Sequence, residues 1–449
     1  MVHRRRSNAV LRALLLSSLA ALGACGSDDK TSVADAADRA YTYTLPLYQL
    51  SATRELAWST VVQRPNVFAH SPALATAASR SVTTPNHDTL YSSAWLLLDG
   101  GPLEIDTPDS GTRYFSLALM DFYSNNIAVL GTRRDGGVAK RFWLVGPSWQ
   151  GTVPDGTELL RSPTNSLWAL GRTYVSGDTT DYPAAHAVQQ QLKAVIPSGT
   201  TTTKPASASV TPPALTDWNS YFSYVDALLA ENQPPPADDF YLAGPETIGV
   251  GAGLSFDPAK VDATQLAAGA SRAYARASGA ASGTAVQGWV YPKSDLGAFG
   301  TDYDYRAIVA LSGLGALPNA EAEYFYGGGD GTVQRYDGTQ NYTLSFPAGQ
   351  LPPSGAFWSL TLYEAESDGS LFFYDNPQNR YALSYPASNL TQGSDGSLTL
   401  YLSHSDPGGD KSANWLPTPA GPFEVVMRIY LPRANVLDGS YHLPPLQRQ

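Results

Sequence analysis

The chain has 449 residues, of which 43% are hydrophobic, 11% aromatic and only 15% charged. This mix, with 40 Gly and 33 Pro, excludes a coiled coil or a long helical array, and the aromatic content excludes general disorder. The 40 acidic residues outnumber the 29 Lys and Arg residues and give a formal net charge of −11, so we expect no nucleic-acid partner.

The first 24 residues have the composition of an export signal. Three consecutive arginines, at 4–6, precede an apolar run over 11–24 that is too short to span a bilayer as a helix. The run ends in Leu-Gly-Ala-Cys at 22–25, which resembles the lipobox of bacterial lipoproteins. We therefore expect a signal peptide over 1–24, a lipid on Cys25 and a tether over 25–40. The alternative is a signal-peptidase site that happens to contain a cysteine.

Helical patterns follow in a few stretches, and the longest comes first. Residues 33–62 predict one or two amphipathic helices with a break at Pro46. Further helices are expected over 181–195, 215–229 and 262–277. A Thr/Ser/Pro-rich connection at 198–213 separates two of them, so we expect a helical middle region over 196–300.

Short, aromatic or β-branched segments bounded by Asp-Gly turns fill most of the remaining sequence. This rhythm is typical of antiparallel sandwiches. We predict a mainly β fold with helical segments (α+β), in which two antiparallel β-sandwich-like domains over 41–195 and 301–449 flank the helical middle. The expected strands are 91–98, 103–107, 114–121, 127–130, 142–145, 342–346, 358–364, 398–403 and 423–430.

One strand pattern occurs twice. Phe-Ser-Leu-Ala-Leu-Met-Asp at 115–121 aligns with Trp-Ser-Leu-Thr-Leu-Tyr-Glu at 358–364. Each copy follows an Asp-Gly turn and a strand that ends in Pro. The matching order of turn, strand, Pro and strand suggests duplication of a β unit.

Several motifs resemble a known bacterial family. In the first half they are Pro-Asn-His-Asp-Thr-Leu-Tyr at 85–91, Arg-Tyr-Phe at 113–115 and Asp-Phe-Tyr at 121–123. In the second half they include Phe-Trp-Ser-Leu-Thr-Leu-Tyr at 357–363, Asn-Trp-Leu-Pro at 414–417 and Arg-Ile-Tyr at 428–430. They resemble the paired domains of unknown function 1254 (N-terminal) and 1214 (C-terminal). The resemblance implies a β-rich, two-part fold, often in exported proteins, and no established reaction.

The common catalytic signatures are missing from the sequence. We find no Gly-x-Ser-x-Gly, no His-Glu-x-x-His and no Cys-x-x-Cys, and no two His residues have metal-ligand spacing. We therefore expect neither a metal nor another cofactor.

The segment 85–91 is the first candidate site. Pro85 is expected to force Thr84 into an extended conformation. Asn86 and Asp88 are short polar side chains just before an apolar strand, so they either bond the turn's own backbone or face a cleft.

In the functional interpretation, His87 and Asp88 are catalytic, with Asp88 as base or orienting group. Asn86 and Tyr91 would then contact the ligand at an aromatic mouth between the domains.

A second candidate pair lies at the ends of the repeated strands. Alternation places Asp121 and Glu364 each at the end of an apolar face, where burial raises carboxyl pKa values. If duplication brings the two units together, these acids face one another, as glycoside hydrolysis requires. The alternative is that each is a solvated acid at a turn.

A third group supplies a cation and large rings. Arg380 would clamp a carboxylate, and Trp415 and Trp358 would stack on a sugar or another planar ligand. The alternative is a buried Arg–Asp pair beside core tryptophans.

Three functional hypotheses remain open. The first is an envelope lipoprotein, at the outer membrane or the periplasmic face, that acts as a metal-independent hydrolase on a small or carbohydrate-like ligand through its carboxylates. The second is a non-catalytic envelope lipoprotein that binds a ligand or partner in the same inter-domain cleft, and the third is a structural envelope component. Whether the protein is an enzyme, and what its substrate and oligomeric state are, is not decided by the sequence.

Overall fold

A computed structural model describes residues 31–61, 64–80, 83–177, 179–279, 283–328, 335–367 and 369–449. The expected signal peptide and Cys25 lie outside the described residues. No helix in the described ranges combines the length and the apolar character that crossing a membrane requires.

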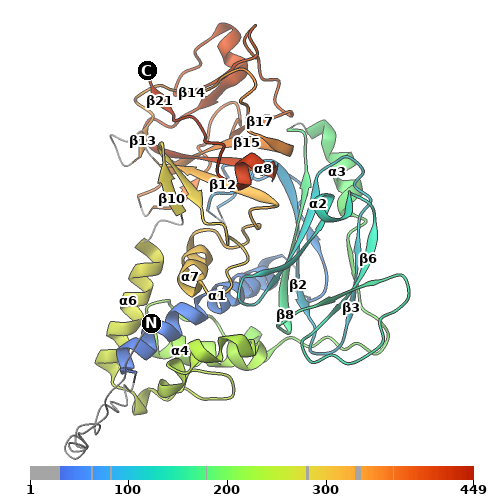
Figure 1. Ribbon diagram of the computed structural model, residues 1–449, viewed down its shortest axis with the longest axis vertical. Helices are drawn as coiled ribbons and strands as arrows, with labels where there is room; N and C mark the ends of the chain where they lie inside the picture. Colours follow the sequence, from blue (N-terminus) through green and yellow to red (C-terminus); the bar gives the residue numbers. More distant parts are fainter. Residues whose placement is uncertain are drawn as a thin grey trace, which may run out of the picture.

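The first β unit is a sandwich of two sheets (Figure 1). The buried side chains between them include Leu103, Ile105, Phe142 and Leu144. In spatial order, the larger sheet is β1 (Ala69–His70), β2 (Thr89–Leu97), β8 (Ser166–Tyr174), β4 (Phe115–Asp121) and β5 (Asn126–Gly131). The smaller is β7 (Glu158–Arg161), β6 (Lys140–Val145), β3 (Leu103–Thr107) and β9 (Lys193–Val195).

The second β unit has the same two-layer design around its own core. Its larger sheet is β10 (Gly283–Val286), β11 (Trp289–Pro292), β12 (Ala322–Gly327), β20 (Pro422–Pro432), β15 (Ser354–Ala365) and β16 (Leu371–Phe372), with β13 (Tyr336–Asp337) on β20 and β17 (Ala382–Tyr385) on β15. Its smaller sheet is β19 (Trp415–Pro417), β18 (Leu398–Ser403), β14 (Tyr342–Phe346) and β21 (Gln447–Arg448).

The two units share one strand topology. The order β2-β8-β4 in the first larger sheet corresponds to β12-β20-β15 in the second. The order β3-β6-β7 in the first smaller sheet corresponds to β14-β18-β19, and the last pair is parallel in both units. The repeated sequence segments are the equivalent strands β4 and β15, so the repeat in sequence corresponds to a repeat in structure.

Alternation along these two strands decides what each face contacts. Phe115, Leu117 and Leu119 of β4 point into the first sandwich core. Trp358, Leu360 and Leu362 of β15 point into the second. The opposite faces of both strands are also buried, which places them against other parts of the molecule.

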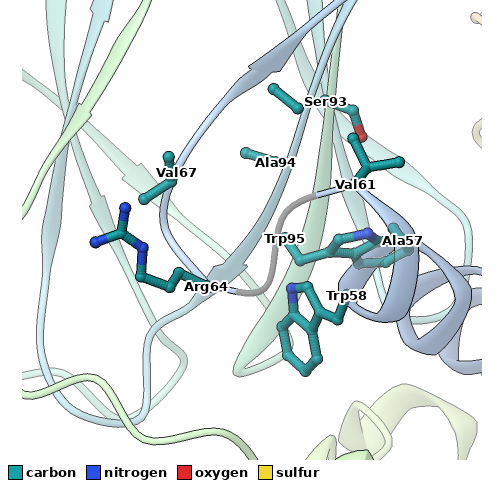
Figure 2. Close-up of a pocket in the computed structure, with 9 residues that line it drawn as sticks. Ala57, Trp58, Val61, Arg64, Val67, Ser93, Ala94 and Trp95 are labelled. Atoms are coloured by element: carbon teal, nitrogen blue, oxygen red, sulfur yellow. The ribbon is translucent and has the colours of Figure 1, made fainter.

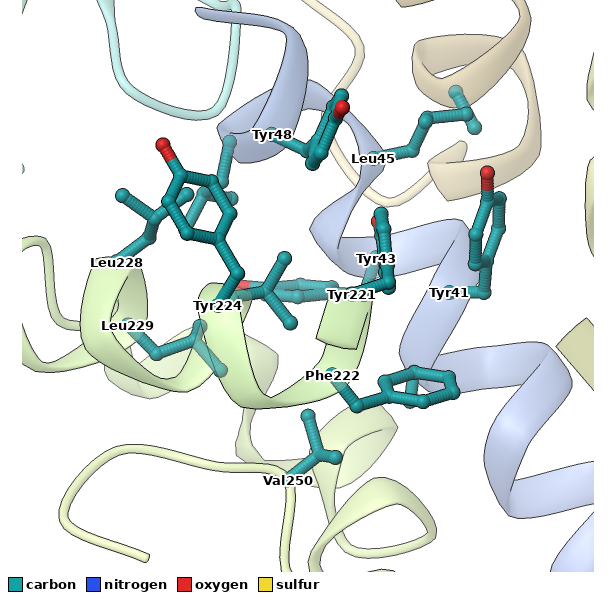
Figure 3. Packing of buried hydrophobic residues seen from close by; sticks show 14 of the residues in the cluster. Tyr41, Tyr43, Leu45, Tyr48, Tyr221, Phe222, Tyr224, Leu228, Leu229 and Val250 are labelled. Atoms are coloured by element: carbon teal, nitrogen blue, oxygen red, sulfur yellow. The ribbon is translucent and has the colours of Figure 1, made fainter. Parts of the chain in front are cut away.

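The helices form a separate layer beside the sheets. The long helix α1 (Val33–Thr60) packs against α4 (Trp218–Glu231), α6 (Ala263–Gly279) and α7 (Tyr303–Ser312). Its tyrosines meet those of α4, as Figure 3 shows, and the Tyr41 and Tyr221 rings stack with centroids 4.5 Å apart. Residues 33–60 therefore share a core with the middle of the chain. The short helices are α2 (Thr132–Asp135), α3 (Tyr182–Gln189), α5 (Asp239–Leu242) and α8 (Ala434–Leu437).

The expected break at Pro46 does not occur, because α1 is one continuous helix. Nearly every side chain between Ala36 and Leu50 is buried. That burial outweighs the roughly 3 kcal/mol that an internal proline costs. The helix expected over 181–195 is also shorter than predicted, since the chain leaves α3 after Gln189 and forms β9.

The architecture confirms the predicted fold class. Antiparallel pairing dominates both units, and helices lie between them in the sequence.

Candidate functional site between the two β units

Each larger sheet presents a cross-strand row of Tyr, Arg and Ser on the face opposite its sandwich core. Residues directly opposite one another on neighbouring strands share a face. The first row is Tyr91, Arg172 and Ser116, and the second is Tyr324, Arg428 and Ser359. The rows occupy equivalent positions in the two units.

The two faces that carry these rows pack against each other. The Tyr114 ring of the first unit lies 5.3 Å from the Tyr430 ring of the second. The Tyr174 ring lies 4.2 Å from that of Phe357. The interface is thus built from equivalent strands of two repeated units, and it encloses both arginines.

Asn86 forms the turn that leads into β2, and it also reaches across the interface. Its Oδ1 accepts hydrogen bonds from the backbone N–H groups of Asp88 (2.6 Å) and Thr89 (3.0 Å), which is the turn-forming role that the sequence allowed. Its Nδ2 donates to the Tyr430 hydroxyl at 2.6 Å.

Thr84 contradicts the expected extended conformation. Its φ is +49°, an uncommon value for a β-branched residue. The strain is held by the second unit: the Thr84 carbonyl accepts from Arg428, and the next carbonyl, that of Pro85, accepts from the Tyr363 hydroxyl at 2.6 Å. Tertiary contacts therefore override the local preference of a residue before proline.

Asp88 is buried and lies against the second unit. Its two carboxylate oxygens accept hydrogen bonds from Ser359 Oγ at 2.6 Å and Ser384 Oγ at 2.5 Å. Only 2% of its surface is exposed. Both oxygens thus already have short, charge-assisted bonds to hydroxyls.

Glu321 is the equivalent acid in the second unit, since it precedes β12 as Asp88 precedes β2. It accepts from the Tyr114 hydroxyl at 2.9 Å and from Arg133 Nε at 2.6 Å, both in the first unit. Burial raises the pKa of Glu321, and Arg133 and Tyr114 oppose that shift. Each unit therefore sends one carboxylate into the other.

Arg428 is well provided with hydrogen-bond acceptors. Its Nη1 donates to Thr361 Oγ1 at 2.9 Å and its Nη2 to the Thr84 carbonyl at 3.1 Å. Burial acts to lower the pKa of Arg428, but Tyr363, Tyr430 and Asp88 raise it above its usual value overall. This guanidinium stays charged and joins the second sheet to the strained turn.

Arg172, in the equivalent position, has fewer partners. Its Nη2 donates to the Gly315 carbonyl at 2.7 Å, and its guanidinium lies 5.4 Å from the centre of the Tyr91 ring. Within the described part of the chain, its buried Nη1 has no hydrogen-bond acceptor. Burial opposes the charge, but the phenols of Tyr91, Tyr324 and Tyr430 raise the pKa of Arg172 overall.

His87 also contacts the second unit, although it is not part of either row. Its Nδ1 bonds to the Ala75 carbonyl at 2.6 Å, so Nδ1 carries the proton in this arrangement. The ring packs edge-on against Tyr381 and Phe373. Burial lowers the pKa of His87, which favours the neutral imidazole.

The structure does not bring Asp121 and Glu364 together. Asp121 Oδ1 accepts from the backbone N–H groups of Tyr123 and Asn125, both at 2.9 Å, and burial raises the pKa of Asp121 to about 6. Glu364 lies half-buried on β15, where burial and the neighbouring Glu366 raise its pKa. Tyr114 and Phe357, at the opposite ends of these strands from the two acids, are in contact, and about 20 Å of strand separates each acid from that contact.

The remaining predicted ligand residues have structural partners. Trp358 is in the second sandwich core and stacks on Tyr385. Arg380 Nη1 donates to the carbonyls of Ser412 and Trp415, both at 2.8 Å, rather than to a carboxylate. The Trp415 indole donates to the Ser403 carbonyl.

Of the predicted site residues, Asn86, His87, Asp88 and Tyr91 belong to this interface. Sequence reasoning missed both arginines, although a signal was present. In each unit, an Arg-x-Tyr triplet lies near the end of the larger-sheet strand that comes last in the sequence. The triplets are Arg-Thr-Tyr at 172–174 in β8 and Arg-Ile-Tyr at 428–430 in β20. Aligning these triplets as a second repeat would have identified the equivalent rows.

Two cavities lie elsewhere. One, of about 100 Å³, is lined by Trp58, Trp95, Val61 and Val67 between the end of α1 and β2 (Figure 2). It is too small for most metabolites. The other, of about 400 Å³, lies beside α5 and the start of α7. In the described ranges, no group of three or more His, Cys, Asp or Glu side chains is arranged to hold a metal ion.

Comparison with family models identifies both β units. A model described as "Protein of unknown function (DUF1254)" matches residues 65–197, and one described as "Protein of unknown function (DUF1214)" matches residues 321–434. The chain belongs to the bacterial family that pairs these two domains. The DUF1254 match covers β1 to β9, and the DUF1214 match covers β12 to β20, so the interface described above lies between the two domains.

A solved structure shows the same fold. The VPA0106 protein from Vibrio parahaemolyticus, known from a crystal structure, is 24% identical in sequence to this DUF1254–DUF1214 chain. The match covers 93% of this chain and 100% of the Vibrio chain, with a TM-score of 0.70. An uncharacterized protein from Burkholderia cenocepacia is 14% identical, with 93% and 94% coverage and a TM-score of 0.45. No curated protein matches the chain.

Proposed function

We propose that this protein is an exported, lipid-anchored binding protein of the bacterial envelope, and that it holds a small carboxylate-bearing ligand between its two β units at Arg172. The observation that carries the proposal is the buried guanidinium of Arg172, whose Nη1 has no acceptor among the described residues. A buried unpaired donor is costly, and a ligand carboxylate would supply the missing bonds.

The charges at the interface favour a ligand with one negative charge. Arg172 and Arg428 are both buried. The charge of Asp88 acts on Arg428, and that of Arg172 acts on Glu321, so each arginine has one nearby carboxylate. Glu321 is already paired with Arg133 at 2.6 Å. One positive charge is thus left over, which a single carboxylate neutralises.

The surroundings favour a ligand with a planar or apolar body. The half-buried side chains of Tyr91, Tyr324 and Tyr326 lie around the two arginines. Phenol rings offer apolar faces, and their hydroxyls are directional donors, so they suit both parts of such a ligand.

Binding is supported better than hydrolysis. A general base must lie within hydrogen-bond reach of the proton that it takes from a substrate, whereas the carboxylates of Asp88 and Asp121 are directed at groups of the protein itself. Both oxygens of Asp88 accept bonds from serine hydroxyls, and Asp121 accepts two backbone N–H bonds. Turnover remains one outcome of the test below.

A thermal-shift screen of the mature chain tests the ligand site, with benzoate, phenylacetate and hexanoate as probes and benzamide as the uncharged control. We expect at least one carboxylate to raise Tm in the wild type and in Arg335→Met, but not in Arg172→Met. Equal shifts in all three proteins would remove Arg172 from the site. Conversion of a probe ester by the wild type but not by Asp88→Asn would favour the hydrolase instead.

The anchor is tested separately by mass spectrometry of the mature amino terminus. We expect a diacylglyceryl group on Cys25, and its loss in Cys25→Ala. An unmodified terminus at another residue would contradict the lipid anchor without affecting the ligand site.

A further inference from the structure

One end of the helical layer exposes a large aromatic side chain. Phe240 of the short helix α5 is 87% exposed. It borders the cavity of about 400 Å³, whose lining also includes Tyr241 and the buried Tyr303, with ring centroids 4.1 Å apart. The lining also includes two acidic residues that form ion pairs, Asp302 with Lys293 and Asp304 with Arg276. An exposed phenylalanine beside a half-buried tyrosine, Tyr241, is typical of residues at the boundary between lipid headgroups and acyl chains.

This aromatic surface lies where the chain enters the fold. The Arg39 guanidinium, in the second turn of α1, lies 4.6 Å from the centre of the Tyr241 ring. Gly244, four residues after Phe240, packs against both Arg39 and Thr31: a side chain built at Gly244 would begin 3.6 Å from the Thr31 methyl group. Figure 1 shows the start of α1 at the helical end of the molecule, away from the second β unit.

The distance to the expected anchor is short. Thr31 lies six positions after Cys25, and six residues span at most about 20 Å. A lipid on Cys25 would therefore hold the start of α1, and the surface around Phe240, within that distance of the membrane.

We propose that Phe240 and the rim of its cavity dock onto the surface of the membrane that holds the lipid anchor, so that the helical end faces the lipid. This inference rests on the proposed lipid anchor at Cys25. The occupant is a zwitterionic lipid surface rather than an anionic one. Removing the four arginines of residues 1–24 takes the formal charge from −11 to −15, which disfavours contact with anionic headgroups.

The test uses the full chain, processed and acylated in a bacterial host, in phosphatidylcholine vesicles with brominated acyl chains. Bromine quenches the fluorescence of nearby tryptophan side chains. The tryptophan of Phe240→Trp therefore reports whether position 240 enters the acyl chains, once the fluorescence of the nine native tryptophans is subtracted. The matched control is Leu437→Trp on α8 of the second unit, where Leu437 is 46% exposed. Circular dichroism checks that both variants fold.

We expect brominated lipid to quench much of the fluorescence that the new tryptophan adds in Phe240→Trp. The fluorescence added in Leu437→Trp should stay unchanged. If neither variant is quenched while the acylated chain is vesicle-bound, the docking is wrong and the anchor stands. If both are quenched equally, the contact is not specific to this end and the docking is also wrong. If the chain is neither acylated nor vesicle-bound, the anchor fails and the docking fails with it.

Discussion

The two β units place the same three residue types at the same positions and use them differently. Arg428 donates to Thr361 and to the strained Thr84, whereas Arg172 has the Gly315 carbonyl and an Nη1 without an acceptor among the described residues. The backbone around the equivalent acids is also alike. The N–H of Val175 donates to the Asp88 carbonyl and that of Leu431 to the Glu321 carbonyl, both at 2.9 Å. The two units thus share one backbone scaffold. Arg428 has structural partners, whereas Arg172 is the arginine that we propose binds a ligand.

Arg428→Met removes the arginine that has structural partners, and it should lower the free energy of unfolding more than any other variant described below. It leaves Asp88 without its nearby cation and the Thr84 carbonyl without its donor, and removing one partner from a buried charged network costs about 3–5 kcal/mol. Urea unfolding measures the change. Arg335→Met is the control: Arg335 forms a partly exposed ion pair with Glu424, worth about 0–1 kcal/mol. Equal losses in the two variants would contradict the structural role of Arg428.

Asp88→Asn and Glu321→Gln compare the two equivalent acids. In Asp88→Asn, the buried Ser359 and Ser384 hydroxyls lose their carboxylate acceptor, and we expect a loss of about 2 kcal/mol. Glu321→Gln should cost less, because its partner Arg133 is 41% exposed and can be hydrated. The same urea experiment ranks them, and the reverse order would refute the comparison.

Glu323→Gln examines a position at which the units differ in polarity. The first unit has the fully buried Leu90 where the second has Glu323, and burial raises the pKa of Glu323 to about 8. The folded chain therefore keeps a proton that the unfolded chain releases near pH 4.5, so this group lowers the free energy of unfolding as pH rises from 4.5 to 8.

The glutamine stays neutral, so the variant should be more stable than the wild type at pH 9, by about 2 kcal/mol after allowance for relaxation around the charge. The two proteins should be similar at pH 4. Unfolding curves at both pH values give the answer, and an identical difference at the two would show that Glu323 does not hold a proton.

Arg172→Met should have the smallest effect on stability. Replacing a buried, incompletely bonded charge by an apolar side chain of similar length is often neutral, so the free energy of unfolding should change by less than about 1 kcal/mol. The rise in Tm that carboxylate probes cause in the wild type should nevertheless be absent in this variant. A loss of stability as large as that of Arg428→Met would mean that both arginines are structural.

Local patterns predicted many elements correctly. Alternation placed Phe115, Leu117 and Leu119 on one face and Trp358, Leu360 and Leu362 on the equivalent face, and both sets are in sandwich cores. The motif at 85–91 pointed to Asn86 and Asp88, which both reach the interface. The two family domains were also recognised in the correct order.

Other expectations failed where distant contacts outweigh local preference. Pro46 does not end α1, because the helix is buried on nearly all sides. Thr84 is not extended, because Arg428 and Tyr363 from the second unit hold its turn. The acids at the strand ends do not meet, because β4 and β15 approach each other beside Tyr114 and Phe357, at the far ends of these strands from the acids.

The order of residues by itself determined which side chains share a strand face, where the turns fall and that one β unit occurs twice, since these depend on neighbours a few positions apart. Only the folded chain decided that the outer faces of the two larger sheets meet, and so that Arg172 and Arg428 lie in one interface. Strand alternation separates the two faces of a sheet but carries no information about what each face contacts. That contact joins positions more than two hundred residues apart, and it is chosen by the packing of the whole molecule.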